Sequence, residues 1–169
     1  LYVLRYAPNG MWEYLASVYF MANKDSEGRL DDEKFYKFLD KITAFIFAYA
    51  FMRPGVSNLR SAIFPEMINI VNKQPVKFEN FKFDEKAVLD VMKNYEFTNR
   101  RTITKSILTW LTFNDERQEM FNLDCKLEIE HIFPKNRQEI ERTLKNSKSL
   151  ESMGNKAILE KRINIRAAD

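Results

Sequence analysis

Apolar residues recur at helical spacing through most of this chain and alternate with polar residues only after Cys125. Before that point, large apolar side chains return every three or four positions, which is the spacing of one face of a helix. Glycine (4 residues) and proline (5 residues) are scarce beside 14 phenylalanines and 7 tyrosines, so the composition favours long helices over many short strands. We therefore expect a mainly α protein that carries a small α+β module in its last quarter.

Residues 1–124 are predicted to form a helical body. Acidic residues in a first turn favour a helix from about Asp31 that ends before Pro54. Ser57 can cap a further helix in which Pro65 marks a kink or a break. The aromatic stripes of this body have the spacing of core packing rather than of a ligand pocket. The expected helices cover residues 10–23, 31–52, 57–71, the segment after Asp84, and 99–112.

No membrane partner is expected for this chain. Its most apolar stretch, residues 42–52, covers 11 residues and is too short to span a bilayer. The N-terminus shows no secretory signal. The single Cys125 excludes an internal disulfide and Cys-x-x-Cys metal knuckles, which favours a reduced, intracellular setting. The chain begins at Leu1 and stops in mid-pattern at Asp169, so we expect it to be a piece of a longer protein.

Residues 125–169 follow a different pattern and are predicted to form a module of their own. Leu127 and Ile129 alternate with Glu128 and Glu130, a period of two that indicates a short strand. The expected order of strand, insertion, strand and helix is the plan of a ββα-metal motif. Its later elements are a helix over 137–150 with Ile140 and Leu144 facing inward, a turn at Gly154-Asn155, a strand over 156–159 and a helix from Glu160.

The single histidine of the chain, His131, follows the carboxylate Glu130 and precedes two asparagines, Asn155 and Asn164. Phosphodiester hydrolysis needs a base for the attacking water and a cation that stabilises the developing charge. Neutral His131 can take the proton, and the oxygens of Glu130 and Asn164 can bind one divalent cation, Mg²⁺ or, as the alternative, Mn²⁺. Asn155 follows a glycine, and we expect it to orient the backbone around His131 rather than to bind metal.

This chemistry makes a geometric demand on the first strand. Adjacent residues of a regular strand point to opposite faces, so Glu130 and His131 cannot both reach one phosphate from it. We therefore expect the strand to end or bend at 130–131. Pro134 is consistent with that expectation, because proline cannot continue the hydrogen-bonding ladder of a sheet.

The positive charge of the chain is concentrated in the same segment. Ten Lys/Arg and seven Asp/Glu lie in residues 126–169, an excess that equals the net charge of +3 of the whole chain. Phosphate-binding proteins place charge in this way, although a solvated mixed-charge surface would have the same composition. The candidate phosphate contacts are Lys135, Arg137, Lys161 and Arg162, each of which fits a solvated surface equally well.

The run Glu130-His131-Ile132-Phe133-Pro134, with the later Gly154-Asn155-x-x-x-Leu159 and Asn164, resembles the HNH or ββα-metal endonuclease superfamily. It is most similar to the C-terminal nuclease domain of GmrSD-type restriction enzymes, which are type IV and modification-dependent. The specific motifs cover residues 127–164, and the helical body resembles that family in its general layout.

The resemblance implies roles for four residues: His131 as general base, Glu130 and Asn164 as ligands of a divalent metal, and Asn155 as the residue that positions the loop of the base. It also implies a restriction enzyme of the bacterial or archaeal cytoplasm that cuts DNA, modified phage DNA in particular, under the control of an N-terminal nucleotide-handling domain or subunit. The family pattern continues beyond Asn164, whereas this chain stops five residues later, so we expect a shortened last helix.

Two other classes of function stay open on the sequence. A helical DNA-binding or protein-interaction module with a degenerate, non-catalytic HNH remnant would bind DNA without regard to metal or to His131. A purely structural fragment would pack against a missing N-terminal region and would be inert alone. The joint order and spacing of Glu130, His131, Asn155 and Asn164 favour the endonuclease.

Overall fold

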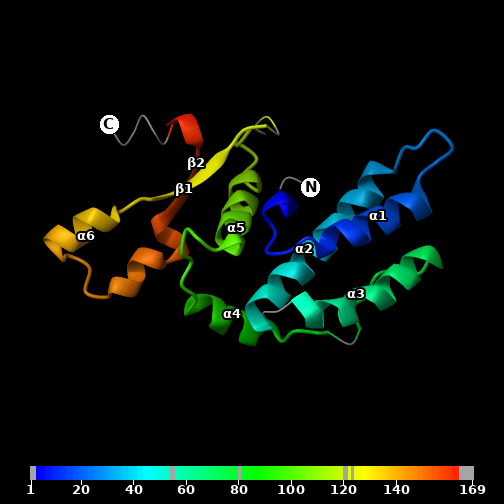
Figure 1. The fold of residues 1–169 in the computed structure, drawn as a ribbon, viewed down its shortest axis with the longest axis horizontal. Coiled ribbons are helices and arrows are strands. Elements are labelled where there is room, and N and C mark those ends of the chain that lie inside the picture. Colours follow the sequence, from blue (N-terminus) through cyan, green and yellow to red (C-terminus); the bar gives the residue numbers. More distant parts are fainter. Residues whose placement is uncertain (1–2, 54–55, 80, 120–121, 123, 164–169) are drawn as a thin grey trace. The chain divides into compact units, whose positions relative to one another are not determined.

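The computed structural model describes residues 3–53, 56–79, 81–119, 122 and 124–163. Over these residues the chain is mainly helical and carries a two-stranded antiparallel sheet, which confirms the expected fold at that level (Figure 1). In the same residues, no helix combines the length and the apolar character that crossing a membrane requires. Contacts divide the chain into two compact units: Asn9–Asn94, and the chain from Tyr95 onward together with the segment before Asn9.

The first unit consists of helices, two of which begin directly after a capping aspartate. The side chain of Asp31 accepts a hydrogen bond from the Lys34 amide at 3.0 Å, and that of Asp84 accepts one from the Ala87 amide at 2.9 Å. Each carboxylate satisfies an amide that has no partner within its helix. Among the described residues of this unit, the helices are α1 (Met11–Asn23), α2 (Asp32–Met52), α3 (Val56–Val71) and α4 (Glu85–Lys93).

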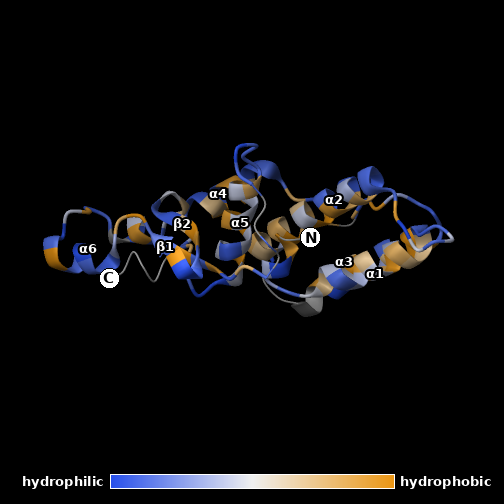
Figure 2. Ribbon diagram, turned by 90° about the horizontal axis from the view of Figure 1, so that it is seen from above, coloured by the Kyte–Doolittle hydropathy of each residue, from blue (hydrophilic) through white to orange (hydrophobic). Residues whose placement is uncertain are grey.

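The core of the first unit forms where α1 lies against α2 and α3, while α4 lies against α2. Hydrophobic and hydrophilic segments alternate along these helices, as expected for helices with one buried face (Figure 2). The most deeply buried side chains come from three helices, which shows that the apolar stripes serve packing. They are Leu15, Ile42, Ile46, Leu59 and Ile63.

Helix α3 can be compared with the prediction at two points. It begins at Val56, one residue before the predicted cap Ser57, and of the two outcomes predicted at Pro65, a kink or a break, the break does not occur. A proline inside a helix removes one backbone hydrogen bond. Leu59 and Ile63 before Pro65 and Ile70 after it are all buried, so packing on both sides stabilises the helix across the missing bond.

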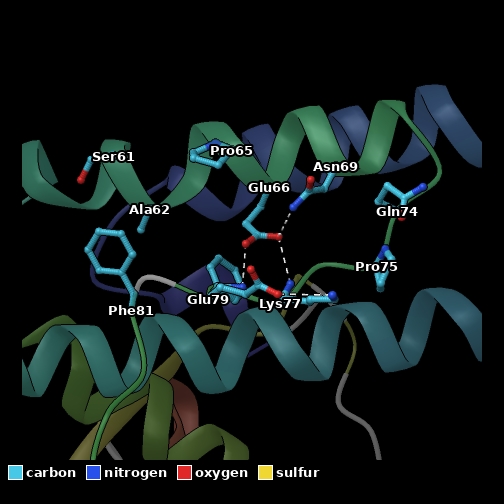
Figure 3. Close-up of a pocket in the computed structure, with 11 residues that line it drawn as sticks. Ser61, Ala62, Pro65, Glu66, Asn69, Gln74, Pro75, Lys77, Glu79 and Phe81 are labelled. Carbon is cyan, nitrogen blue, oxygen red and sulfur yellow. Dashed lines mark hydrogen bonds and ion pairs between the residues drawn. The ribbon is translucent and has the colours of Figure 1, made fainter.

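A buried carboxylate on α3 fixes the connector between α3 and α4 (Figure 3). The Glu66 side chain accepts hydrogen bonds from the amides of Lys77 (2.9 Å) and Phe78 (2.6 Å) and from the Asn69 side chain (3.1 Å). Phe78 adopts a left-handed backbone with φ of 52°, which is unfavourable for a residue with a side chain. Its ring stacks on Phe45 with centroids 3.8 Å apart. The carboxylate and the stacking together offset that cost.

The second unit contains the two strands. Figure 1 shows β1 and β2 side by side, with α5 next to them. Its long helix α5 (Thr102–Phe113) buries Ile103 and Ile107. The remaining elements are a 3-10 turn at Leu4–Tyr6, β1 (Leu127–His131), α6 (Lys135–Glu141), 3-10 turns at Ser147–Glu151 and Met153–Asn155, and β2 (Lys156–Glu160), after which residues 161–163 are helical. Helix α5 therefore groups with the strands, although the predicted module began only at 125.

The helix predicted over 137–150 is wrong in its extent. Helix α6 ends at Glu141, because Arg142 adopts a left-handed backbone with φ of 51°. The Gln138 side chain then bonds both the amide and the carbonyl of Leu144, at 2.9 and 3.2 Å, and holds the chain in a turn. Ile140 was expected to face inward, but it is 75% exposed. The second strand also runs one residue further than predicted, to Glu160.

We predict that Glu66→Gln lowers the free energy of unfolding by about 1–3 kcal/mol, because an amide in place of the carboxylate loses at least one acceptor for buried donors. Chemical denaturation followed by circular dichroism measures the change. Glu79→Gln is the matched control, since Glu79 is exposed and its pairing with Lys77 lies in solvent. Equal stability of the two variants would contradict the role given to Glu66.

Candidate active site around His131

The register of the two strands determines which side chain His131 meets. The pairs run from Leu127 opposite Glu160 to His131 opposite Lys156. Backbone hydrogen bonds link Lys161 to Lys126 and Ile132 to Asn155, and hydrogen-bonded pairs alternate along an antiparallel ladder. His131 and Lys156 therefore form a non-hydrogen-bonded pair, in which the two side chains share a face and approach most closely.

The outer edge of β1 is held by two side chains from the α5 region. Leu127 and Ile129, like His131, occupy non-hydrogen-bonded positions of the ladder. Their carbonyls therefore point away from β2. The Asn99 side-chain amide donates to the Ile129 carbonyl at 3.1 Å, and the Lys105 ammonium donates to the Leu127 carbonyl. Burial lowers the pKa of Lys105, and the nearby Glu128 partly opposes that shift. These bonds fix the strand that carries His131.

Asn155 holds the loop that follows His131. Its side-chain oxygen accepts from the Phe133 amide at 2.7 Å, and its side-chain nitrogen donates to the carbonyls of Phe133 (3.2 Å) and Leu150 (3.1 Å). Its backbone carbonyl accepts from the Ile132 amide at 3.0 Å. The side-chain amide thus extends the sheet ladder by one residue, up to Pro134, which has no amide hydrogen to continue it.

The buried Lys156 lies at the centre of a polar cluster that consists of Lys156, the half-buried His131 and Glu151, and the exposed Asn99. The Lys156 side chain is 0% exposed, and those of His131 and Glu151 are 13% and 24% exposed. Its ammonium lies 2.5 Å from His131 Nε2, 2.6 Å from a Glu151 oxygen and 2.8 Å from the Asn99 side-chain oxygen. The second Glu151 oxygen lies 3.5 Å from Nε2.

Two opposing influences determine the pKa of Glu151. Burial raises it, while the hydrogen bond and the charge of Lys156, together with His131, lower it, and the net result is a pKa below the ordinary value. The Glu151 carbonyl also accepts from the buried Phe97 amide at 2.7 Å, which anchors the segment that carries this carboxylate. Glu151 is therefore a preorganised anionic partner for Lys156.

Glu130, one of the two predicted metal ligands, does not share a face of β1 with His131. Glu130 pairs with Ala157 in the same regular ladder, so β1 ends only after His131 and the two residues point to opposite faces. Asn164, the other predicted ligand, lies outside the described residues. Within the described part of the chain, no group of three or more His, Cys, Asp or Glu side chains could hold a metal ion.

The four candidate phosphate contacts fall at two ends of the sheet. Lys135 and Arg137 are exposed on α6, which follows the His131 end, and Arg137 pairs with Glu141 at 2.9 Å. Lys161 and Arg162 follow the other end of β2, about 13 Å away along the strand. There they pair with Glu128 (3.6 Å) and Glu160 (3.1 Å). Lys135 and Arg137 are therefore closer to His131 along the chain and the sheet, and they are better placed to contact a phosphate near the histidine.

The partners of the histidine that were not predicted from the sequence are Lys156, Glu151 and Asn99. A signal for Lys156 was present, because alternation places it on the same face of the second strand as Ile158. A lysine at such a position must be buried or at an edge. Its pairing with His131 depends on the strand register, and Asn99 lies 57 positions from Lys156 in the chain, so neither contact follows from local spacing.

No family model, curated protein or solved structure matches this chain.

We predict that Asn155→Ala loosens the loop after His131, because the Phe133 amide loses its acceptor. Hydrogen exchange at that amide should become faster, and stability should fall by roughly 1–2 kcal/mol for the lost hydrogen bonds. Asn136→Ala, at an exposed position of α6, is the control and should leave both quantities nearly unchanged. Unchanged protection of the Phe133 amide in Asn155→Ala would rule out the tether.

The lowered pKa of Glu151 predicts a pH-dependent contribution to stability. A carboxyl group with a lowered folded pKa stabilises the fold above its ordinary pKa, and this contribution is lost as the pH falls through the lowered value. Wild type should therefore exceed Glu151→Gln in stability at neutral pH, and the difference should shrink in acid. Urea unfolding across pH measures it, with the exposed Glu139→Gln as control. A difference that does not change with pH would contradict the assignment.

Proposed function

We propose that this chain is an endonuclease domain that hydrolyses phosphodiester bonds of DNA, with His131 as the general base. The observation that carries the proposal is the tether from Asn155 to both backbone groups of Phe133, two residues after the histidine. A general base acts efficiently only when its ring is held in one orientation. A single histidine at the end of a strand, followed by a loop fixed by an asparagine, provides that support.

The roles of the chain's own residues follow from this arrangement. His131 would accept a proton from the attacking water at a ring nitrogen. The bonds of Asn99 and Lys105 to the edge of β1 would keep the strand in place. Lys135 and Arg137, which are exposed on the helix after the histidine, would contact backbone phosphates.

A divalent cation, Mg²⁺ or Mn²⁺, belongs to the proposal, with Glu130 and Asn164 as its ligands. When bound, it would stabilise negative charge that develops on the phosphate. Of the two ligands, the described residues include only Glu130, a half-buried carboxylate on the face opposite to His131. One carboxylate is too little to define a site for a divalent cation, which usually takes several oxygen ligands.

The biological setting rests on the resemblance of residues 127–164 to GmrSD-type nuclease domains. On that basis we propose a type IV restriction enzyme of the bacterial or archaeal cytoplasm. Its substrate would be modified phage DNA, and its partner would be an N-terminal nucleotide-handling domain or subunit. The net positive charge of residues 126–169 is in keeping with a nucleic-acid substrate.

A second candidate is a DNA-binding or interaction module with a non-catalytic HNH remnant. The contact between Lys156 and His131 Nε2 favours it, because a ring nitrogen that accepts a hydrogen bond from an ammonium has no free lone pair for water. The opposite orientation of Glu130 favours it as well. The two candidates differ in whether cleavage occurs and whether it depends on His131.

We predict that the chain nicks supercoiled phage or plasmid DNA in the presence of Mg²⁺ or Mn²⁺, and that His131→Ala reduces the rate by roughly 10²- to 10⁴-fold, the usual contribution of a general base. Gel electrophoresis of the DNA over time measures the rate. Lys145→Met, at an exposed position, is a control that should retain activity.

Cleavage that survives His131→Ala, or that is unaffected by a chelator, would contradict the proposed mechanism. If the chain binds DNA without cleaving it, and if binding is the same with and without metal and in His131→Ala, the non-catalytic module would be favoured instead.

A further inference from the structure

Lys156 has a buried ammonium whose hydrogen-bonding capacity is completely used. An ammonium group carries three hydrogens and no acceptor. The Lys156 ammonium has three acceptors within 2.8 Å: the Asn99 side-chain oxygen, a Glu151 carboxylate oxygen and His131 Nε2. Because the side chain is 0% exposed, water cannot replace any of the three. The carboxylate of Glu151, 2.6 Å away, is the opposite charge that such a buried ammonium requires.

This arrangement determines the chemical state of the histidine ring. A hydrogen on Nε2 would face the ammonium hydrogens across 2.5 Å, which is repulsive, whereas the Glu151 oxygen that could accept such a hydrogen lies further away, at 3.5 Å; the shorter contact favours Nε2 as the acceptor. The hydrogen of the neutral ring is then on Nδ1. In water the Nε2–H tautomer of histidine predominates, so the Lys156 contact selects the form that is less populated in solvent.

We propose that Lys156 is a positioning residue for His131: through its bonds to Glu151 and Asn99, it fixes the ring in one orientation and in the Nδ1–H tautomer, with Nε2 held as the acceptor. The anchors of this arrangement are themselves fixed. Asn99 also donates to the Ile129 carbonyl, and the Glu151 carbonyl accepts from the Phe97 amide. The ammonium thus has little freedom to leave Nε2 while the cluster stays intact.

One consequence rests on the proposed function. If His131 is the base of an endonuclease, Nε2 must leave the Lys156 ammonium before it can take a proton from water, so the described arrangement is a closed state of the site. The positioning role of Lys156 itself requires no nuclease activity and can be tested without DNA.

The test is a long-range ¹H–¹⁵N correlation spectrum of the ¹⁵N-labelled, 169-residue chain at mildly alkaline pH. The chain has one histidine, so its two ring nitrogens give the only imidazole signals and are assigned by their couplings to the two ring hydrogens. We expect Nδ1 to resonate as a protonated nitrogen and Nε2 as an unprotonated acceptor. A spectrum in which Nε2 carries the hydrogen, or in which the two tautomers exchange rapidly, would overturn the proposal.

Lys156→Met extends the test, with Lys145→Met as the control that removes the same charge from an exposed position. Lys156→Met should shift the equilibrium to the Nε2–H tautomer, and the control should keep the wild-type spectrum. The wild-type spectrum decides the tautomer by itself, so the proposal stays testable even if Lys156→Met does not fold. A folded Lys156→Met variant that keeps the Nδ1–H tautomer would show that Lys156 is only a structural residue.

The two proposals fail in distinguishable ways. Absence of DNA cleavage, together with a fixed Nδ1–H tautomer in the wild type, would reject the endonuclease and leave the positioning role standing. Cleavage that depends on His131, together with an Nε2–H tautomer, would reject the positioning role and leave the endonuclease standing.

Discussion

The pairing of His131 with Lys156 across the antiparallel sheet is the contact on which the described site depends. A shift of the register by one residue would move His131 to a different partner and would reverse which side chains of β2 share its face. Asn155 prevents such a shift, because its side chain and backbone together bind Ile132 and Phe133 at the end of the ladder. The tether and the buried ammonium are therefore parts of one arrangement.

Both units use a buried charged group to fix irregular backbone. In the first unit, Glu66 accepts three hydrogen bonds and holds the connector in which Phe78 adopts a left-handed conformation. In the second unit, Lys156 donates three hydrogen bonds and joins a strand, a 3-10 turn and the loop before α5. Burying a charge is costly unless its hydrogen-bonding groups are satisfied, and in both cases they are.

Much of the fold could be predicted from the sequence, because helix periodicity and capping are local properties. The helices expected from about Asp31 and after Asp84 are present, and the alternation at Leu127 and Ile129 marks a strand. The predictions failed where tertiary contacts outweigh local preference. Helix α3 continues through Pro65 because residues on both sides are buried, and α6 stops at Glu141 where Gln138 turns the chain. The exposed Ile140 shows that an apolar residue at helical spacing need not face a core.

By itself, the sequence determined which residues could carry chemistry: one histidine beside a carboxylate, followed by two asparagines in a positively charged segment. It also predicted that the strand ends or bends at 130–131, whereas the regular ladder of the structure keeps Glu130 and His131 on opposite faces. Only the tertiary structure decided what His131 contacts. The partners Lys156, Glu151 and Asn99 are brought together by strand register and by the packing of α5 against the sheet. Those are long-range interactions, and their geometry is not encoded in the spacing of residues along the chain.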